Sequence, residues 1–474
     1  MFASYTIWQK KNFFIIISVL MGTLLGVLTL VGAGFPKPIS GVFFVALIAI
    51  FVTIISGDPK RFLLFFLILD ISLNIDINLG NNPAISDDPN GWNISIANIS
   101  LVILYLLWFA ELLSKKKKNK FKFYPEMSIP MLGLIGTGLL SFMNTTSVLF
   151  SSYEILQLFE LFLMFLYVAN HIHEEKDIKL ILYALFVGII LQALLVVLQF
   201  FTKTQYDFLL KVNAYTDPLF RPSGSFGHAN GVAGYLAPLL AICISLYLSK
   251  IKIVRPWFVL LTLMLGAVAL ASTLSRGGWI SFIIAVWIMF VVNLHYQWLK
   301  IPPNLVLISI IGLLIVSVAF GASIVYRTSS DFEPILSRIP LMTIAFNMIK
   351  AQPLFGIGVN TFAQQLPNYT QGIPPGTWLY VVHSKYLIIW AEDGIFGLFF
   401  FVWFLVSIFR KGIKLVRNNN PFYSPLALGI TAGLAGFSIH MFGDTFQTRG
   451  LVYTLWLLAA LLVGVETLSR KRAP

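Results

Sequence analysis

The sequence predicts an all-α polytopic membrane protein with about 14 transmembrane helices (12–14) and a large external loop that contains an amphipathic helix. Of the 474 residues, 58% are hydrophobic and only 11% are charged, whereas soluble proteins carry about 25% charged residues. The apolar residues gather in continuous runs of about 20 residues, the length of a membrane-spanning helix. The runs do not alternate as barrel strands do, so a transmembrane β-barrel is excluded.

The predicted spans follow one another along the whole chain, so we expect a single integral membrane domain over residues 1–474. Span 61–79 is interrupted by Asp70, Asn74 and Asp76, and span 128–143 is short. In chain order, the predicted spans are 13–34, 39–56, 61–79, 94–113, 128–143, 155–170, 178–201, 229–248, 256–275, 277–294, 304–322, 386–409, 425–442 and 450–468.

Lysine and arginine are distributed unevenly over the loops between these spans. Most of the 33 basic residues fall in alternate loops, and cytoplasmic loops are the ones enriched in Lys and Arg. We therefore expect both termini in the cytoplasm and the long segments 202–228 and 323–385 on the external face. The formal net charge of +13 is then a topology signal, and we expect no nucleic-acid partner. The lysine-rich run at 115–122 is expected to be a solvated loop, with anionic-lipid contact as the alternative.

The first external segment, 202–228, leads into Arg221-Pro-Ser-Gly-Ser-Phe-Gly-His228-Ala-Asn230-Gly231. Its glycines and proline form a tight backbone directly before a helix. The N–H groups at a helix N-terminus bind anions, and the Arg221 guanidinium is a bidentate donor suited to phosphate. The alternative is an ordinary turn with a helix cap.

Arg276 lies in a very short external turn, Thr273-Leu-Ser-Arg276-Gly277-Gly278-Trp279. An arginine at the end of a membrane helix commonly extends to the lipid headgroups. The two glycines that follow favour a site instead, because they allow a backbone or a ligand to approach closely.

The second external segment, 323–385, contains apolar residues at helical spacings of 3, 4 and 3 after Arg338. This pattern predicts an amphipathic helix along the outer membrane interface, with Pro340 in its first turn. The apolar residues are Ile339, Met342, Phe346 and Ile349. The stretch 353–360 ends this helix, and its Gly-Ile-Gly follows no strand, so it is not a dinucleotide-binding motif.

The same segment closes with His383-Ser384-Lys385 at the mouth of span 386–409. A histidine at an external helix mouth is suited to act as a general base near neutral pH. The alternative is a capping or interface residue.

Ionisable residues also occur within or beside the apolar runs. Glu392 and Asp393 lie inside span 386–409, where such side chains indicate function by default, although they could pair internally. His440 and Asp444, four residues apart, are expected to form a hydrogen-bonded pair that supports the structure.

Signals for metal or cofactor binding are weak. His171-Ile-His173-Glu174-Glu175 contains ligand types but falls in a charged cytoplasmic loop without a third partner at helical spacing. The chain has no HExxH, paired CxxC, P-loop or G-x-S-x-G motif, and its single Cys243 allows no intrachain disulfide. We expect neither a metal nor a cofactor.

Four motifs, taken in order, resemble the O-antigen ligase and polymerase superfamily of bacterial membrane glycosyltransferases. Each motif is short, but their order and spacing match the family over about 180 residues. They are RPSGSFGHANGVAGYLA at 221–237, STLSRGGW at 272–279, PLFGIGVNTF at 353–362 and HSKYLIIWAEDGIFGL at 383–398.

The resemblance implies a transfer reaction on the outer face of the bacterial cytoplasmic (inner) membrane. Family members take a glycan from an undecaprenyl-diphosphate donor and attach it to lipid A-core in lipopolysaccharide biosynthesis, to another lipid-linked repeat, or to protein. Arg221, Arg276 and His383 match the family's essential residues, and Arg338 matches a further basic position less closely. The remaining candidates for substrate binding, inside the same motifs, are His228, Asn230 and Lys385.

The resemblance and the charges agree on a mechanism. A glycosyl diphosphate leaves as a dianion or more, and two guanidinium groups can stabilise the charge on its leaving oxygens. The short loop between the first two predicted spans, at about residues 35–38, has no acidic residue, so we expect a metal-independent reaction. Direct attack by an acceptor hydroxyl activated by His383 would invert the anomeric carbon. Typical ligases have about twelve spans, so the larger count predicted here departs from the family.

Three other functions are weighed against a ligase. A repeat-unit polymerase uses the same chemistry and is not separated from a ligase by the sequence. A secondary transporter is favoured by Asp70, Glu160, Glu392 and Asp393 in apolar runs, but the internal repeats typical of transporters are not found. A passive scaffold leaves the external Arg and His residues unexplained. An enzyme should gather Arg221, Arg276 and His383 at the external mouth.

Overall fold

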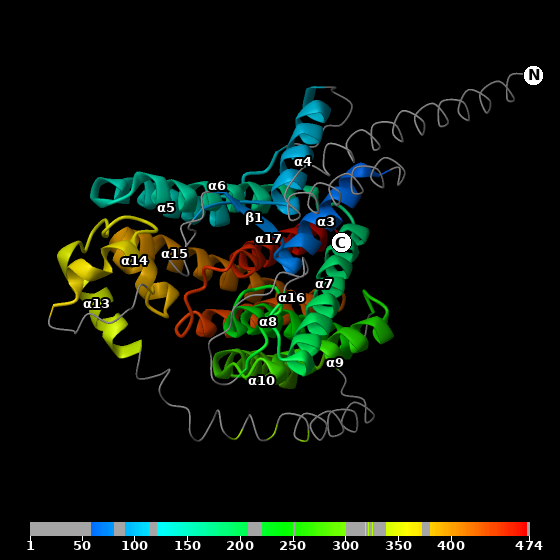
Figure 1. Cartoon of the computed structure of the whole chain (residues 1–474). Helices are drawn as coiled ribbons and strands as arrows, with labels where there is room; N and C mark the ends of the chain where they lie inside the picture. Colours follow the sequence, from blue (N-terminus) through cyan, green and yellow to red (C-terminus); the bar gives the residue numbers. More distant parts are fainter. Residues whose placement is uncertain are drawn as a thin grey trace, which may run out of the picture.

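The computed structural model describes residues 58–79, 91–113, 121–206, 220–249, 252–299, 338–371 and 380–471, with the single positions 318, 321 and 325. Over these ranges the chain is almost entirely helical (Figure 1). Eight of the described helices are long and apolar enough to cross a membrane. The chain is therefore an all-α, multi-pass membrane protein, as the sequence predicts.

Helices and one small antiparallel sheet follow one another in the described residues. In chain order they are α3 (Pro59–Leu73), β1 (Asp76–Leu79), β2 (Trp92–Ser95), α4 (Ile96–Leu113), α5 (Pro125–Ser141), η1 (Phe142–Asn144), α6 (Val148–His171), α7 (Glu175–Thr202), α8 (Ala229–Leu248), α9 (Pro256–Ser272), α10 (Arg276–Tyr296), α13 (Arg338–Ala351), α14 (Phe362–Gln365), η2 (Leu366–Tyr369), α15 (Lys385–Arg417), α16 (Tyr423–His440) and α17 (Arg449–Lys471).

Most predicted spans coincide with one helix each. This holds for the predictions from 94–113 to 277–294 and for those from 386–409 to 450–468. Apart from positions 318 and 321, the predicted spans 13–34, 39–56 and 304–322 lie outside the described residues, so the count of about 14 stays a prediction.

The prediction of one continuous span at 61–79 is wrong. Helix α3 ends at Leu73, Asn74 adopts a left-handed conformation (φ 51°), and β1 follows, paired antiparallel with β2. The polar residues that interrupt the run bind the start of α17 instead of continuing the helix. The buried Arg449 guanidinium binds Asp70 (3.1 Å) and Asp76 (3.2 Å).

Two helices form the centre of the bundle. In the most apolar stretch of 18 residues, 89% of the residues of α8 and of α17 are buried inside the protein, compared with 22% of those of α10. Helix α8 packs against α9, α10 and α16, whereas α17 packs chiefly against α6. The outer helices expose large apolar side chains, such as Phe109 of α4 and Trp287 of α10. Such an outer surface is suited to contact with lipid chains.

Helix α13 confirms the predicted helix after Arg338, and the position of its predicted apolar side at the outer membrane interface stays a prediction. Ile349 is buried, whereas Ile339 is 56% exposed and Phe346 is 45% exposed. Helix α13 is apolar on two sides, and the side packed on the protein lies next to the predicted one. It buries Leu341, Ile344, Ala345, Met348 and Ile349 in a second hydrophobic core, separate from that of the bundle. Helices α13 and α14 lie together at one end of the molecule (Figure 1).

Helix α15 is broken at Gly394 (φ 70°, ψ −168°), where the segment 353–358 docks against it. Ile357 N–H donates to the Ala391 carbonyl (2.9 Å), and Gly358 N–H donates to that of Glu392 (3.1 Å). The backbone approaches so closely that a Cβ on Gly394 would lie 2.2 Å from the Leu354 carbonyl oxygen. The N–H groups of the 353–362 motif thus replace the helical hydrogen bonds that are lost at the break. These contacts also hold the first turns of α15 in place.

Candidate active site

The predicted site residues lie at helix ends that the fold brings to the same end of the bundle. The segments that meet there are the loop 220–228, the α9–α10 turn, the start of α13, residues 381–385 and the α16–α17 connection 441–448. Because neighbouring helices of the bundle alternate in direction, each of these segments begins or ends a helix at this same end of the bundle.

Arg221 is buried between its own loop and the α9–α10 turn. Its Nε donates to the Thr273 carbonyl (3.1 Å) and its Nη2 to Asn230 Oδ1 (2.9 Å). The Arg221 carbonyl accepts from Gln205 Nε2 (2.6 Å). These bonds hold the guanidinium where α8 and α10 both begin.

Asn230 joins the two arginine segments. Its Oδ1 also accepts from Ser275 Oγ (2.9 Å), and Ser275 is the N-cap of α10, accepting from Gly278 N–H (3.3 Å). Arg276 is the first residue of that helix and is half-buried. Asn230 therefore positions Arg221 and Arg276 relative to each other, through one bond to each segment.

His228 connects the same loop to the α16–α17 connection. Its Nδ1 accepts from Gly231 N–H (2.9 Å), so that His228 caps α8. Its Nε2 lies 3.2 Å from Thr448 Oγ1. With Nδ1 used as an acceptor, a neutral His228 carries its proton on Nε2 and donates it to Thr448.

His440 and Asp444 lie beside this loop, and both are buried. His440 Nε2 is 3.7 Å from Asp444 Oδ2, an ion-pair distance that is too long for the predicted hydrogen bond. A Cβ on Gly277 would lie 3.0 Å from His440 Nδ1, and one on Gly234 would lie 3.1 Å from Nε2. The glycine after Arg276 therefore makes room for this imidazole.

Asp444 is a carboxylate surrounded by cationic and imidazole side chains. Burial alone would raise the pKa of Asp444, but His440, His228, the Phe446 N–H and His383 together bring it below its ordinary value. The Phe446 N–H donates to Asp444 Oδ1 (2.8 Å). Asp444 is therefore ionised at neutral pH and compensates part of the positive charge.

Arg338, at the start of α13, lies near the same residues of the α16–α17 connection. Its guanidinium lies next to the α16–α17 connection, since a Cβ on Gly443 would be 3.6 Å from Nη1. Burial lowers the pKa of Arg338; Asp444 opposes this shift, whereas the charges of Arg276 and Arg221 add to it. Arg338 therefore lies close enough to Arg276 and Arg221 to be repelled by their charges, and Asp444 compensates part of this repulsion.

His383 is half-buried at the entrance to α15. The Lys385 N–H donates to the Met441 carbonyl (2.9 Å), which ties this entrance to the α16–α17 connection. His383 is accordingly among the groups that lower the pKa of Asp444.

Lys385 points elsewhere. Its Nζ lies 3.9 Å from Glu154 Oε1 on α6, and both side chains are largely buried. Glu392, further along α15, accepts from the Phe362 N–H (2.8 Å). The structure thus gathers six of the seven predicted site residues and places Lys385 in a neighbouring ion pair.

Three residues of the proposed site, Ser275, Asp444 and Thr448, were not identified as site residues from the sequence. Ser275 carries a recognisable signal, a serine directly before a helix. Asp444 was interpreted as structural, because its cationic neighbours come from distant segments. Thr448 carries no sequence signal of its own.

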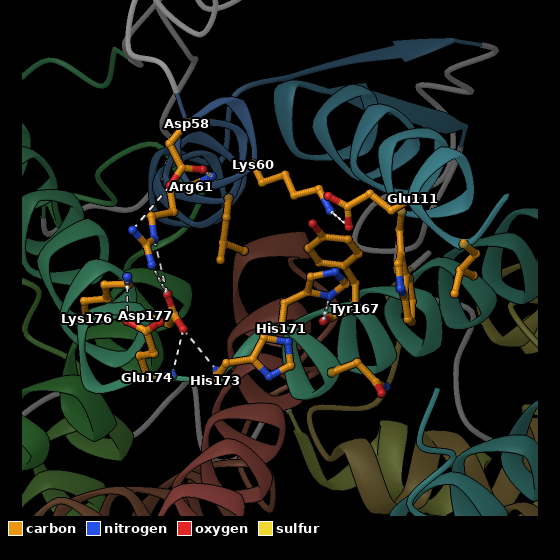
Figure 2. Close-up of a pocket in the computed structure, with 14 residues that line it drawn as sticks. Asp58, Lys60, Arg61, Glu111, Tyr167, His171, His173, Glu174, Lys176 and Asp177 are labelled. Atoms are coloured by element: carbon orange, nitrogen blue, oxygen red, sulfur yellow. Dashed lines mark hydrogen bonds and ion pairs between the residues drawn. The ribbon is translucent and has the colours of Figure 1, made fainter. Parts of the chain in front are cut away.

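A charged cavity of about 330 Å³ lies at the opposite helix ends and is lined by His171 and His173, the potential metal ligands (Figure 2). His171 stacks on Tyr167, with ring centroids 3.9 Å apart. Within the described ranges, no group of three or more His, Cys, Asp or Glu side chains is arranged to hold a metal ion.

Comparison with known proteins bears on the Arg–His cluster, that is, on Arg221, Arg276, Arg338 and His383. Residues 261–402 match the family model described as O-antigen ligase. The resemblance to the O-antigen ligase superfamily is therefore confirmed. The O-antigen ligase match includes Arg276, Arg338 and His383, whereas Arg221 precedes it. No curated protein matched the chain.

Proposed function

We propose that this chain is a glycosyltransferase of the O-antigen ligase type. It transfers a glycan from an undecaprenyl-diphosphate donor to lipid A-core or another glycan acceptor, on the external face of the bacterial cytoplasmic membrane. The observation that carries this proposal is that the segments bearing Arg221, Arg276, Arg338 and His383 meet beside the α16–α17 connection, which contains Asp444. Most of these residues lie in the segment that matches the O-antigen ligase family.

The three arginines are suited to a diphosphate. Arg276 and Arg338 are half-buried, whereas Arg221 is buried, so we expect Arg276 and Arg338 to contact the ligand directly. Planar guanidinium groups bind phosphate oxygens through two parallel hydrogen bonds. They also stabilise the charge that develops as the diphosphate leaves, so the proposed reaction is metal-independent.

His383 supplies the remaining chemical role. It accepts the proton of the acceptor hydroxyl as the oxygen bonds to the anomeric carbon of the donor sugar. The bond between that carbon and the diphosphate oxygen breaks, and its electron pair leaves with the phosphate. The attack comes from the side opposite to the leaving group, so the configuration inverts.

A polymerase would use the same groups with a lipid-linked repeat as the acceptor. Lipid-linked glycans in a deletion strain distinguish the two: full-length chains accumulate without a ligase, and single repeats accumulate without a polymerase. The transporter alternative has less support, because several of its acids have local partners. Asp70 binds Arg449, Glu160 binds Asn98, and Glu392 accepts a hydrogen bond from the Phe362 N–H.

The decisive experiment measures donor binding and transfer separately on the purified chain. We expect His383→Ala to bind an undecaprenyl-diphosphate glycan with unchanged affinity, because the arginines hold the diphosphate. Its transfer rate should fall roughly 100- to 10,000-fold through loss of the general base. His295→Ala, on α10 far from the cluster, is the matched control and should keep full activity.

Two outcomes would contradict this proposal. If His383→Ala loses donor binding and keeps its turnover, the role given to His383 is wrong. If transfer stops in a chelator and returns with magnesium or manganese, the arginines do not carry the phosphate charge alone.

A further inference from the structure

A second cavity with charged lining residues, of about 700 Å³, lies far from the proposed active site. It is enclosed by residues 122–127 at the start of α5, by Lys411 of α15 and by residues 466–471 at the end of α17. Helix α17 has 23 residues and is therefore about 35 Å long, enough to cross a membrane. The cavity thus lies at the membrane surface opposite to Arg449 and the proposed active site.

This α5–α17 cavity has more positive than negative charge. Its lining contains two acids, Glu126 and Glu466, and four basic residues: Lys122, Lys411, Arg470 and Lys471. The buried Lys411 binds Glu466 and also Glu126 (3.0 Å). Glu466 also accepts from Arg470 (2.7 Å). Both acids are therefore already engaged with Lys411 and Arg470.

Two lysines provide the surplus charge. Among the residues that the structure describes, Lys471 Nζ contacts only a neutral group, the His173 carbonyl (3.5 Å). Within the described residues, the Lys122 ammonium forms no ion pair, and its backbone alone is bound, to Asn170. Both side chains are exposed, so these two ammonium groups are available to an anion.

The cavity of Figure 2 lies at the same helix ends and provides a contrast. Its basic residues are matched by acids: Lys60 binds Glu111, Arg61 binds Asp177 (3.0 Å), and Lys176 binds Glu174 (2.5 Å). A further acid, Asp58, lies 3.3 Å from Arg61. This cavity has no surplus positive charge, so it does not attract an anion as the α5–α17 cavity does.

The α5–α17 cavity also borders an apolar surface. Phe123 lines it and is 37% exposed, and the adjacent Phe121 is 51% exposed. On α5, Ile129 and Leu132 are exposed as well. A ligand with an anionic head and apolar chains would match both surfaces, because basic pockets between membrane helices bind anionic lipid headgroups.

We propose that the α5–α17 cavity binds an anionic glycerophospholipid. The phosphodiester contacts Lys122, Lys471 and Arg470, and the acyl chains lie along Phe123 and the exposed side of α5. The site is independent of the proposed transfer reaction, since it lies on the other membrane surface.

The test titrates the purified full chain, in uncharged detergent, with dioleoyl phosphatidylglycerol and with dioleoyl phosphatidylcholine. We expect preferential binding of phosphatidylglycerol by the wild type. Lys122→Gln/Lys471→Gln should weaken it roughly 25-fold, because each basic residue near a lipid surface contributes about fivefold. Both side chains are exposed, so without lipid the double variant should have the same melting temperature as the wild type. Lys122→Gln alone should lose about fivefold.

Lys176→Gln is the matched control, since it removes an exposed lysine from the compensated cavity of Figure 2. It should bind phosphatidylglycerol as the wild type does. Unchanged binding by the double variant, or an equal loss in the control, overturns the proposal. Glycerol phosphate is the third ligand, and binding of it as tight as that of phosphatidylglycerol would make this a site for soluble anions and not for lipid.

Discussion

Asp444 is the residue on which the charge balance of the proposed site depends. It is fully buried beside His440, and it also lowers the electrostatic cost of placing Arg338 near Arg276. Like charges held close together destabilise a fold unless an opposite charge compensates them. Asp444 therefore contributes to stability as well as to the field that a diphosphate would meet.

Asp444→Asn should lower the melting temperature at neutral pH. Loss of one partner from a buried charge cluster costs about 3–5 kcal/mol. Because the pKa of Asp444 is lower in the folded chain than its ordinary 3.8, its stabilisation is present above that value and is lost as the pH falls through the folded pKa. The measurement is the melting temperature of both proteins between pH 7 and pH 3. A difference that stays constant in acid would contradict the assignment.

Arg276→Lys distinguishes a phosphate-binding arginine from one that merely extends to lipid headgroups. Lysine keeps the charge but loses the planar pair of donors. We expect a folded protein whose transfer rate is roughly 100- to 1000-fold lower, as for loss of one transition-state donor. The control is Arg255→Lys, an exposed arginine before α9. If Arg276→Lys transfers glycan at the wild-type rate, its proposed role is wrong.

At the scale of elements, the break in α15 makes one glycine indispensable. Gly394→Ala places a side chain at φ 70° and ψ −168°, a conformation essentially restricted to glycine that costs about 1–3 kcal/mol, and directs its Cβ into the backbone at Leu354. We expect a lower melting temperature and a lower transfer rate, since segment 353–358 supports the start of α15. Gly136→Ala, where a Cβ meets nothing within 4 Å, should leave both unchanged. Equal melting of the two variants would contradict the importance of the break.

Elements were predictable where the signal is local. Apolar runs located α7 to α10, because membrane-spanning length is a property of contiguous sequence. The end of α3 was not predictable, since its cause is Arg449, 379 residues from Asp70 along the chain. The side of α13 that packs on the protein was not predicted for a similar reason, because hydropathy shows two apolar sides and only packing distinguishes the one that faces the protein from the one that faces the membrane.

The proposed site was predictable to a different degree. Resemblance of the motifs singled out Arg221, Arg276 and His383, which no periodicity would have brought together. The links between them, from Asn230 to Ser275 and from His228 to Thr448, depend on contacts between distant segments. Lys385 shares a motif with His383, yet one residue between them is enough to direct its side chain toward Glu154.

At the scale of the whole molecule, the orientation of the bundle is a prediction that cysteine labelling can check. The single native cysteine, Cys243, is fully buried and gives little background. In right-side-out vesicles, a membrane-impermeant maleimide should label Lys350→Cys of α13, on the side of the proposed site. It should label Lys176→Cys, at the opposite helix ends, only after permeabilisation. The reverse pattern would place the Arg–His cluster in the cytoplasm.

The two hydrophobic cores divide the mechanical support of the site. Arg221 and Arg276 lie at helix ends of the bundle, whereas Arg338 begins α13, which packs in the second core together with Val381 and Val382 just before His383. Helix α15 joins the two cores, since Ile388 packs in the second core and Ile389 in that of the bundle, so the distance between the phosphate-binding groups and the base depends on the packing of both. The proposed site therefore lies where the two cores meet, and its working geometry depends on how both cores pack on α15.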